Sequence, residues 1–256
     1  MAKRFFLTMV IGLVFCATVA VADPALNGRW FVDDWDEVLI FDNGNWELWA
    51  GEYPRLRGTY TAGNGAIVLT ATHAHASELD ALGLELQAEW YTRSEIVSLS
   101  VAETKTLFTA GLLDELRMFL AEMLEELRMV LPDNPLDELR QQMGELIVDA
   151  EIQELTANVV EVFGQEFADA NEGLASIITA ELADTDDSPE FAEIIVEIAK
   201  IAMLGVFYML IDELEELFWT NTGAYSVSGD TLLLAIDLFG RADLYTDVEP
   251  VRLTRQ

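Results

Sequence analysis

A gapless internal repeat constrains this chain more than any other feature of its sequence. The 13 residues from Gly58 to Thr70 align with those from Gly223 to Ala235. Each copy predicts a strand, a tight turn and a second strand, because glycine tolerates the positive φ that hairpin turns need. Two such copies so far apart indicate a single antiparallel β-barrel, split by the sequence between them.

Strand and turn signals also alternate around both copies. Apolar runs lie at Trp30–Val32, Val38–Phe41 and Trp46–Trp49, and Asp42-Asn43-Gly44-Asn45 predicts a hairpin turn between the last two. A spacing of about ten residues, with turn residues between the runs, is typical of an antiparallel meander. Later strands are expected at Ala224–Val227, Thr231–Ile236, Asp243–Tyr245 and Val251–Thr254.

The intervening sequence has helical periodicity from Lys105 to Phe218. Thr92-x-x-Glu95 is a candidate capping box, which would mark a helix start and the exit from the sheet. Apolar residues then recur every three or four positions, as in Leu113, Leu116, Leu120, Met123, Leu127 and Val130. We therefore predict an α+β fold with barrel parts at 23–104 and 219–256 and an inserted helical bundle at 105–218.

The last predicted helix is the most apolar one. Ser188-Pro189-Glu190 provides a cap, a proline and an acid for its start. Ile201–Ile211 is apolar on every side, which is expected of a helix at the centre of a bundle. Eleven residues are too few to span a membrane, so we expect no membrane span in the mature chain.

The N-terminus has the pattern of a secretory signal peptide at residues 1–22. Lys3 and Arg4 precede an apolar run, and Ala20-Val21-Ala22 is a small-x-small cleavage site. We expect cleavage near Ala22 and export to the periplasm or the cell surface. Cys16, the only cysteine, is the alternative as a lipidated residue, but the bulky Phe15 precedes it. Cleavage after Ala22 removes this cysteine, so no disulfide is expected.

The acidity of the chain restricts its partners. Asp and Glu number 46 against 14 Lys and Arg, a formal net charge of −32. A polyanion repels phosphate backbones and anionic lipid surfaces, so direct nucleic-acid binding is not expected. Acidic residues spread this widely usually form a solvated surface. A more specific explanation of the acidity is that it binds a basic partner or a cation.

Few residues have a pattern that suggests catalysis or metal binding. His73 and His75 are the only histidines, and their i, i+2 spacing on a strand would let both grip one metal ion from a shared face. By parity with Ile67 and Leu69 that face points inward. No third ligand is evident, and no Gly-x-Ser-x-Gly, phosphate-loop or dinucleotide motif occurs. We therefore expect neither a catalytic site nor a cofactor.

The ordered set of motifs resembles a known family. Gly28-Arg29-Trp30 is similar to the Gly-x-Trp signature of lipocalins and related calycin barrels, and the whole order of strands is similar to small exported lipocalin-like proteins of bacteria, spirochaetes among them. The resemblance implies that a basic residue near the end of the last strand packs over Trp30; Arg252 and Arg255 are the candidates, and Arg255 is preferred. It also implies a tendency to bind ligands.

Two functions follow from this sequence. The first is a non-enzymatic protein that binds a small hydrophobic ligand in the barrel or at the junction with the helices, with Trp46, Leu48, Tyr60 and Leu69 as the pocket wall. The second is an interaction or structural protein whose acidic helical bundle docks a protein partner.

Overall fold

The computed structural model describes residues 22–32, 36–130, 149–183, 188–236 and 250–255, together with residues 135, 138, 139 and 141. These residues form two compact units. The barrel unit combines the residues up to Arg93 with those from Glu215 onward, and the helical unit comprises Ser94–Leu214. Residues 1–21 of the predicted signal peptide, with Cys16, and the expected strand at Asp243–Tyr245 lie outside the described residues.

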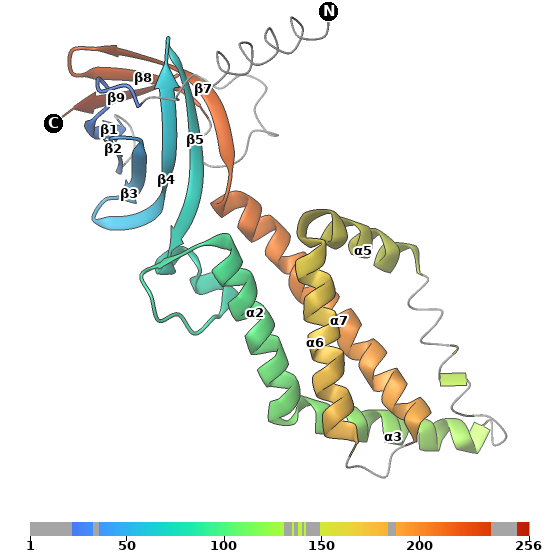
Figure 1. Ribbon diagram of the computed structural model, residues 1–256. Helices are drawn as coiled ribbons and strands as arrows, with labels where there is room; N and C mark the ends of the chain where they lie inside the picture. The colour runs from blue at the N-terminus through green and yellow to red at the C-terminus, as the bar shows by residue number, and fades with distance from the viewer. Residues whose placement is uncertain are drawn as a thin grey trace, which may run out of the picture. The chain divides into compact units, whose positions relative to one another are not determined.

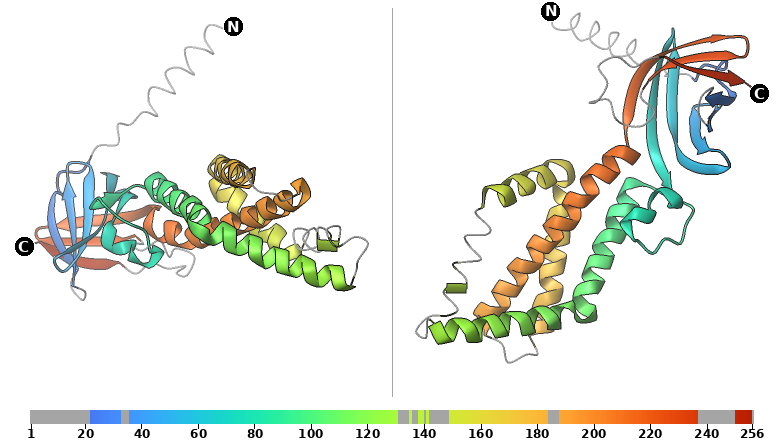
Figure 2. Two further views of the ribbon diagram at one scale, coloured as in Figure 1. Left: turned by 90° about the horizontal axis from the view of Figure 1, so that it is seen from below. Right: turned by 180° about the vertical axis from the view of Figure 1, so that it is seen from behind.

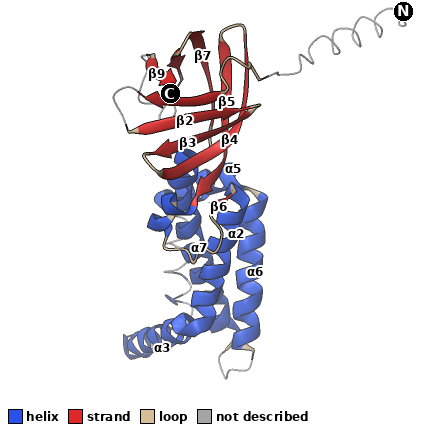
Figure 3. Ribbon diagram, turned by 90° about the vertical axis from the view of Figure 1, so that its left-hand side faces the viewer, coloured by secondary structure: helices blue, strands red, loops and turns tan. Residues whose placement is uncertain are grey.

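Within the described residues, eight antiparallel strands form a closed barrel (Figures 1 and 3). They are β1 (Gly28–Val32), β2 (Glu37–Asp42), β3 (Asn45–Ala50), β4 (Tyr53–Gly63), β5 (Ala66–His75), β7 (Thr220–Ser228), β8 (Thr231–Ala235) and β9 (Val251–Arg255). The order around the barrel is β4-β3-β2-β1-β9-β8-β7-β5, and pairing of β5 with β4 closes it. The short β6 (Trp90–Tyr91) pairs with the last residues of β5. The predicted barrel is therefore confirmed.

Two seams join the distant segments of the barrel. Strand β5 pairs with β7, from Ala66 opposite Ala224 to Thr70 opposite Thr220. Strand β1 pairs with β9, where Trp30 lies opposite Arg255. Each seam satisfies backbone groups that would otherwise form an open sheet edge.

The two copies of the repeat are the hairpins β4–β5 and β7–β8, and their first glycines have the same role. A Cβ atom on Gly58 would lie 1.8 Å from the carbonyl oxygen of Thr70, and one on Gly223 would lie 2.2 Å from that of Ala235. No residue with a side chain fits at such distances. Glycine at both positions therefore allows one backbone to approach another closely.

The helices of the helical unit begin before Lys105, where the helical periodicity was predicted to start. They are α2 (Arg93–Leu107), α3 (Leu113–Val130), α5 (Ala150–Phe163), α6 (Gln165–Leu182) and most of α7 (Pro189–Leu217). Helix α2 begins at Arg93, where the capping-box pattern placed a helix start, and Lys105 lies near its end. Gly111, with φ of +121°, interrupts the helix between α2 and α3, and the chain changes direction there (Figures 1 and 2).

Helix α7 starts as predicted but is not covered on every side. The backbone N–H of Phe191 donates to Ser188 Oγ at 3.3 Å, so Ser188 caps the helix. Phe207 is buried, with its ring centroid 4.9 Å from that of Phe163 and 5.3 Å from that of Phe167. Tyr208 and Met209 are exposed, however. The expectation of a central helix is therefore wrong for one face, because the neighbouring helices cover only part of its circumference.

Two helical stretches among the described residues are long and apolar enough to cross a membrane when length and composition alone are considered. They are Arg93–Glu126, which includes the interruption at Gly111, and Pro189–Leu217. Core helices of water-soluble proteins can satisfy the same criteria.

Candidate functional site

The four residues predicted as a pocket wall are packed inside the barrel. Trp46, Leu48, Tyr60 and Leu69 are each at most 2% exposed. The ring of Tyr60 meets that of Phe41 edge to face at a centroid distance of 4.9 Å. The ring of Trp46 stacks on that of Trp219 at 5.4 Å. Within the part of the chain that the structure describes, these side chains are buried and fill the barrel interior instead of lining an open cavity there.

The residues that follow the expected cleavage site close one end of the barrel. Leu26 is fully buried, and its carbonyl oxygen accepts a hydrogen bond from Trp30 Nε1 at 2.6 Å. Arg255 Nη2 donates to the carbonyl oxygens of Ala25 at 2.7 Å and Asn27 at 3.2 Å. The Arg255 guanidinium carbon also lies 4.3 Å from the centroid of the Trp30 ring. The contact expected between Arg255 and Trp30 is thus present.

Equivalent tyrosines of the two repeat copies hold the segment 23–27. Tyr60 donates its hydroxyl proton to Asn27 Oδ1 at 3.1 Å, and Tyr225 donates to Asp23 Oδ2 at 2.5 Å. The Tyr225 bond, with a second from the backbone N–H of Ala25, lowers the pKa of the Asp23 carboxyl. Burial and the bond to Asp23 raise the pKa of Tyr225 to about 12. The internal repeat therefore supplies two matched anchors for the segment.

The two histidines lie on the outer wall, not on the inward face. The β4–β5 register shifts between Arg57 and Gly58, and as a result Ala71 and Ala74 are both buried. One extra residue in a strand reverses the faces of all that follow, so the parity prediction for His73 and His75 is wrong. Among the described residues, no group of three or more His, Cys, Asp or Glu side chains is placed to hold a metal.

His75 is part of a turn. Its Nδ1 lies 2.8 Å from Ser77 Oγ and accepts the backbone N–H of Ser77 at 3.2 Å, so it caps the 3₁₀ turn Ala76–Glu78. The ring also meets that of Trp90 edge to face at 5.3 Å. The distance between Ser77 Oγ and His75 Nδ1 is within the range of a catalytic serine and its base. Here, however, the same ring nitrogen also accepts the backbone N–H of Ser77 and so caps the turn.

A groove of about 540 Å³, lined by Trp46 and Ile40 as well as by charged residues, lies on the outer wall of strands β2 to β5. Glu47, Arg57 and His73 occupy opposing positions on adjacent strands. The carboxylate of Glu47 accepts Trp49 Nε1 at 2.9 Å, and the guanidinium of Arg57 lies 4.6 Å from the centroid of the Trp90 ring. Glu47 and Arg57 thus already have partners within the wall.

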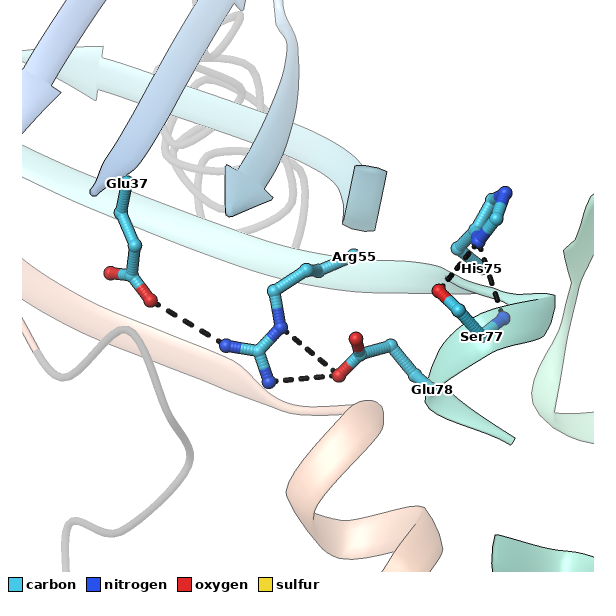
Figure 4. A network of polar contacts seen from close by, with 5 residues as sticks. All are labelled: Glu37, Arg55, His75, Ser77 and Glu78. Carbon is cyan, nitrogen blue, oxygen red and sulfur yellow. Dashed lines mark hydrogen bonds and ion pairs between the residues drawn. The ribbon is translucent and has the colours of Figure 1, made fainter. Parts of the chain in front are cut away.

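Sequence reasoning missed a cluster of two acids around one arginine (Figure 4). Arg55 Nη2 lies 2.8 Å from Glu78 Oε2, and Arg55 Nη1 lies 3.5 Å from Glu37 Oε1. Burial raises the pKa of Glu37, although Arg55 opposes the effect, and Glu37 Oε2 has no hydrogen-bond partner among the described residues. The three residues are far apart in sequence, so no local pattern could have identified them.

The exposed apolar surface lies mainly on the helices. Most of the large apolar side chains that are exposed belong to the helical unit: Leu107, Leu112, Met118, Phe119, Met129, Val160, Tyr208 and Met209. The described part of the barrel unit contributes Tyr53 and Leu233. Exposed apolar residues that lie side by side are typical of an interaction surface, whereas single ones are common on any protein.

Comparison with known proteins finds no match for this chain among family models, curated proteins or solved structures. Its function is therefore inferred from its own residues.

Proposed function

We propose that this chain is an exported, non-catalytic interaction protein. In this proposal a lipocalin-like barrel is a packed platform, and the acidic helical unit docks a protein partner. The observation that carries the proposal is the contrast between the two units: the predicted pocket residues of the barrel are buried, whereas the helices expose large apolar side chains.

Exposed side chains such as Phe119, Met129 and Met209 are more than half accessible to water. Covering apolar surface is favourable by about 25 cal/mol per Å² before the costs of association. Charge accompanies this apolar surface, since the sequence from Ser94 to Leu214 contains 27 acidic and 5 basic residues, a formal net charge of −22. A partner would therefore combine apolar and basic groups.

A small hydrophobic ligand inside the barrel has less support. Among the described residues, Trp46, Leu48, Tyr60 and Leu69 are buried in the barrel interior, and Leu26, also buried, accepts a hydrogen bond from Trp30. A ligand would have to displace one of these side chains, at the cost of their packing.

The barrel type and export are part of the proposal. The stacking of Arg255 on Trp30 supports a lipocalin-like barrel. The contacts of Asp23 and Leu26 support cleavage near Ala22, because the residues that follow this position belong to the barrel while the preceding run has the pattern of a signal peptide.

Photo-crosslinking in the source organism tests the docking role. A photoreactive residue is placed at Tyr208 or Phe119 in the helical unit, and at Tyr53 or Leu233 in the barrel as exposed controls. We expect a crosslinked protein from the helical positions and none from the controls. Crosslinks from the barrel positions alone, or from none of the four, would contradict the proposal.

A further inference from the structure

The apolar face of α3 is wider than the part that its own unit covers. Leu113, Leu120 and Leu124 are buried and define the inward face. At 100° per residue, Leu116, Phe119 and Met123 form a second row beside it, and Leu112, the residue directly before α3, extends this row by one turn. Leu112 is 43% exposed and Phe119 61%, while Leu116 and Met123 are half-buried. We call these four residues the α3 row.

A parallel row of carboxylates borders the α3 row on its solvent side. Glu115, Glu122 and Glu126 are exposed and have the spacing i, i+7 and i+11. Arg117, which pairs with Asp114 at 3.5 Å, lies on the far side of the helix from this acidic row. The α3 row is thus an apolar stripe with acids along one edge.

The negative charge of the acidic row limits which molecules could cover the α3 row. A second copy of this chain would bring two acidic rows together, and an anionic membrane would be repelled in the same way. A helix with an apolar stripe and flanking lysines or arginines complements both rows, as helices do when they pair along apolar seams flanked by opposite charges.

We propose that the α3 row docks a basic amphipathic helix of a partner protein, an inference that rests on the proposed docking role of the helical unit. Phe119 is the central anchor because it is large, aromatic and the most exposed member of the row. The acidic row sets the orientation of the partner helix and increases its rate of association at low salt.

Titration of the purified mature protein with a synthetic peptide tests this inference. The probe is a fluorescent helical peptide with a leucine stripe flanked by lysines, and its scrambled version is the reference. We expect Phe119→Ser to weaken binding at least about tenfold. Met129→Ser is the matched control, because Met129 is 80% exposed on the same helix but lies outside the α3 row. Circular dichroism checks that both variants keep their helices.

A charge variant tests the acidic row separately. Replacing Glu115, Glu122 and Glu126 together by glutamine should remove most of the salt dependence that wild type shows between about 0.02 M and 0.5 M salt. Glu172→Gln, an exposed acid on α6, should leave the salt dependence unchanged. Equal binding of the scrambled peptide, or equal losses from the Phe119 and Met129 variants, would overturn the inference.

Two further outcomes separate this inference from the proposed function. If the protein binds vesicles of neutral phosphatidylcholine through Phe119 but does not bind the peptide, the inference about a partner helix is overturned in favour of a lipid surface. If the partner crosslinked at Tyr208 is captured equally by the Phe119→Ser variant, the docking role stands and the inference about the α3 row fails.

Discussion

Substitution of Gly58 by alanine tests the close approach of strands within the barrel. The new Cβ would lie 1.8 Å from the Thr70 carbonyl oxygen and 2.9 Å from Trp46 Nε1. A backbone atom cannot rotate away, so β4 or β5 must shift. Overpacking costs about 1–3 kcal/mol, and loss of the Trp46 hydrogen bonds to Thr59 and Thr70 adds about 1 kcal/mol. We expect the free energy of unfolding to fall by about 2–4 kcal/mol.

Gly63→Ala is the matched control on the same strand. Apart from its chain neighbours, no described residue has an atom within 4 Å of its added Cβ, and the substitution should change stability by less than about 1 kcal/mol. Urea unfolding followed by tryptophan fluorescence measures both, because all six tryptophans of the chain lie outside Ser94–Leu214. Equal midpoints for the two variants would refute the close-approach argument.

Three other predictions concern the polar contacts of the barrel. Arg255→Ala should lower stability by about 1–3 kcal/mol in the same urea assay, because it removes the stacking on Trp30 and the hydrogen bonds to Ala25 and Asn27; an unchanged midpoint would contradict this role. The folded-state pKa of Tyr225 is raised from 10.0 to about 12, so its contribution to stability is complete below about pH 10 and is lost as pH rises toward 12. Tyr225→Phe should abolish that loss in urea titrations from pH 9 to about 12, and a Phe variant with the wild-type pH profile would disprove the assignment. Arg55→Met removes the shared cation of Glu37 and Glu78. Burial raises the pKa of Glu37, so we expect a larger loss of stability at pH 7 than at a pH low enough to neutralise Glu37; a loss that does not vary with pH would argue against the cluster.

Sequence patterns were sufficient wherever a local signal determines the structure. The repeat at Gly58 and Gly223 predicted the two hairpins, and Ser188 predicted the start of α7. Arg255 was preferred over Arg252 as the partner of Trp30, and the expected contact is present. These features depend on turn residues, caps and strand order, which are readable from neighbouring residues.

Features that depend on register or on distant residues were not predictable in this way. The register shift near Gly58 places His73 and His75 on the outer wall. No residue type in β5 predicts this shift from the sequence. Leu26 lies between Ala25 and Asn27, outside any apolar run. Its burial at the barrel end depends on the fold of strands far along the chain. The half-covered α3 row has the same periodicity as a fully buried stripe, so exposure of Phe119 could be found only from the packed helices.

Native mass spectrometry of the protein purified from its own source tests the central claim most directly, because one spectrum reports both small ligands and protein partners. We predict a mature chain that begins at or near Asp23, is associated with a basic protein and releases no small molecule when it is denatured. A hydrophobic compound that stays with the isolated chain and is released on unfolding, without any protein partner, would contradict the claim that the helices rather than the barrel interior are the binding part of this protein.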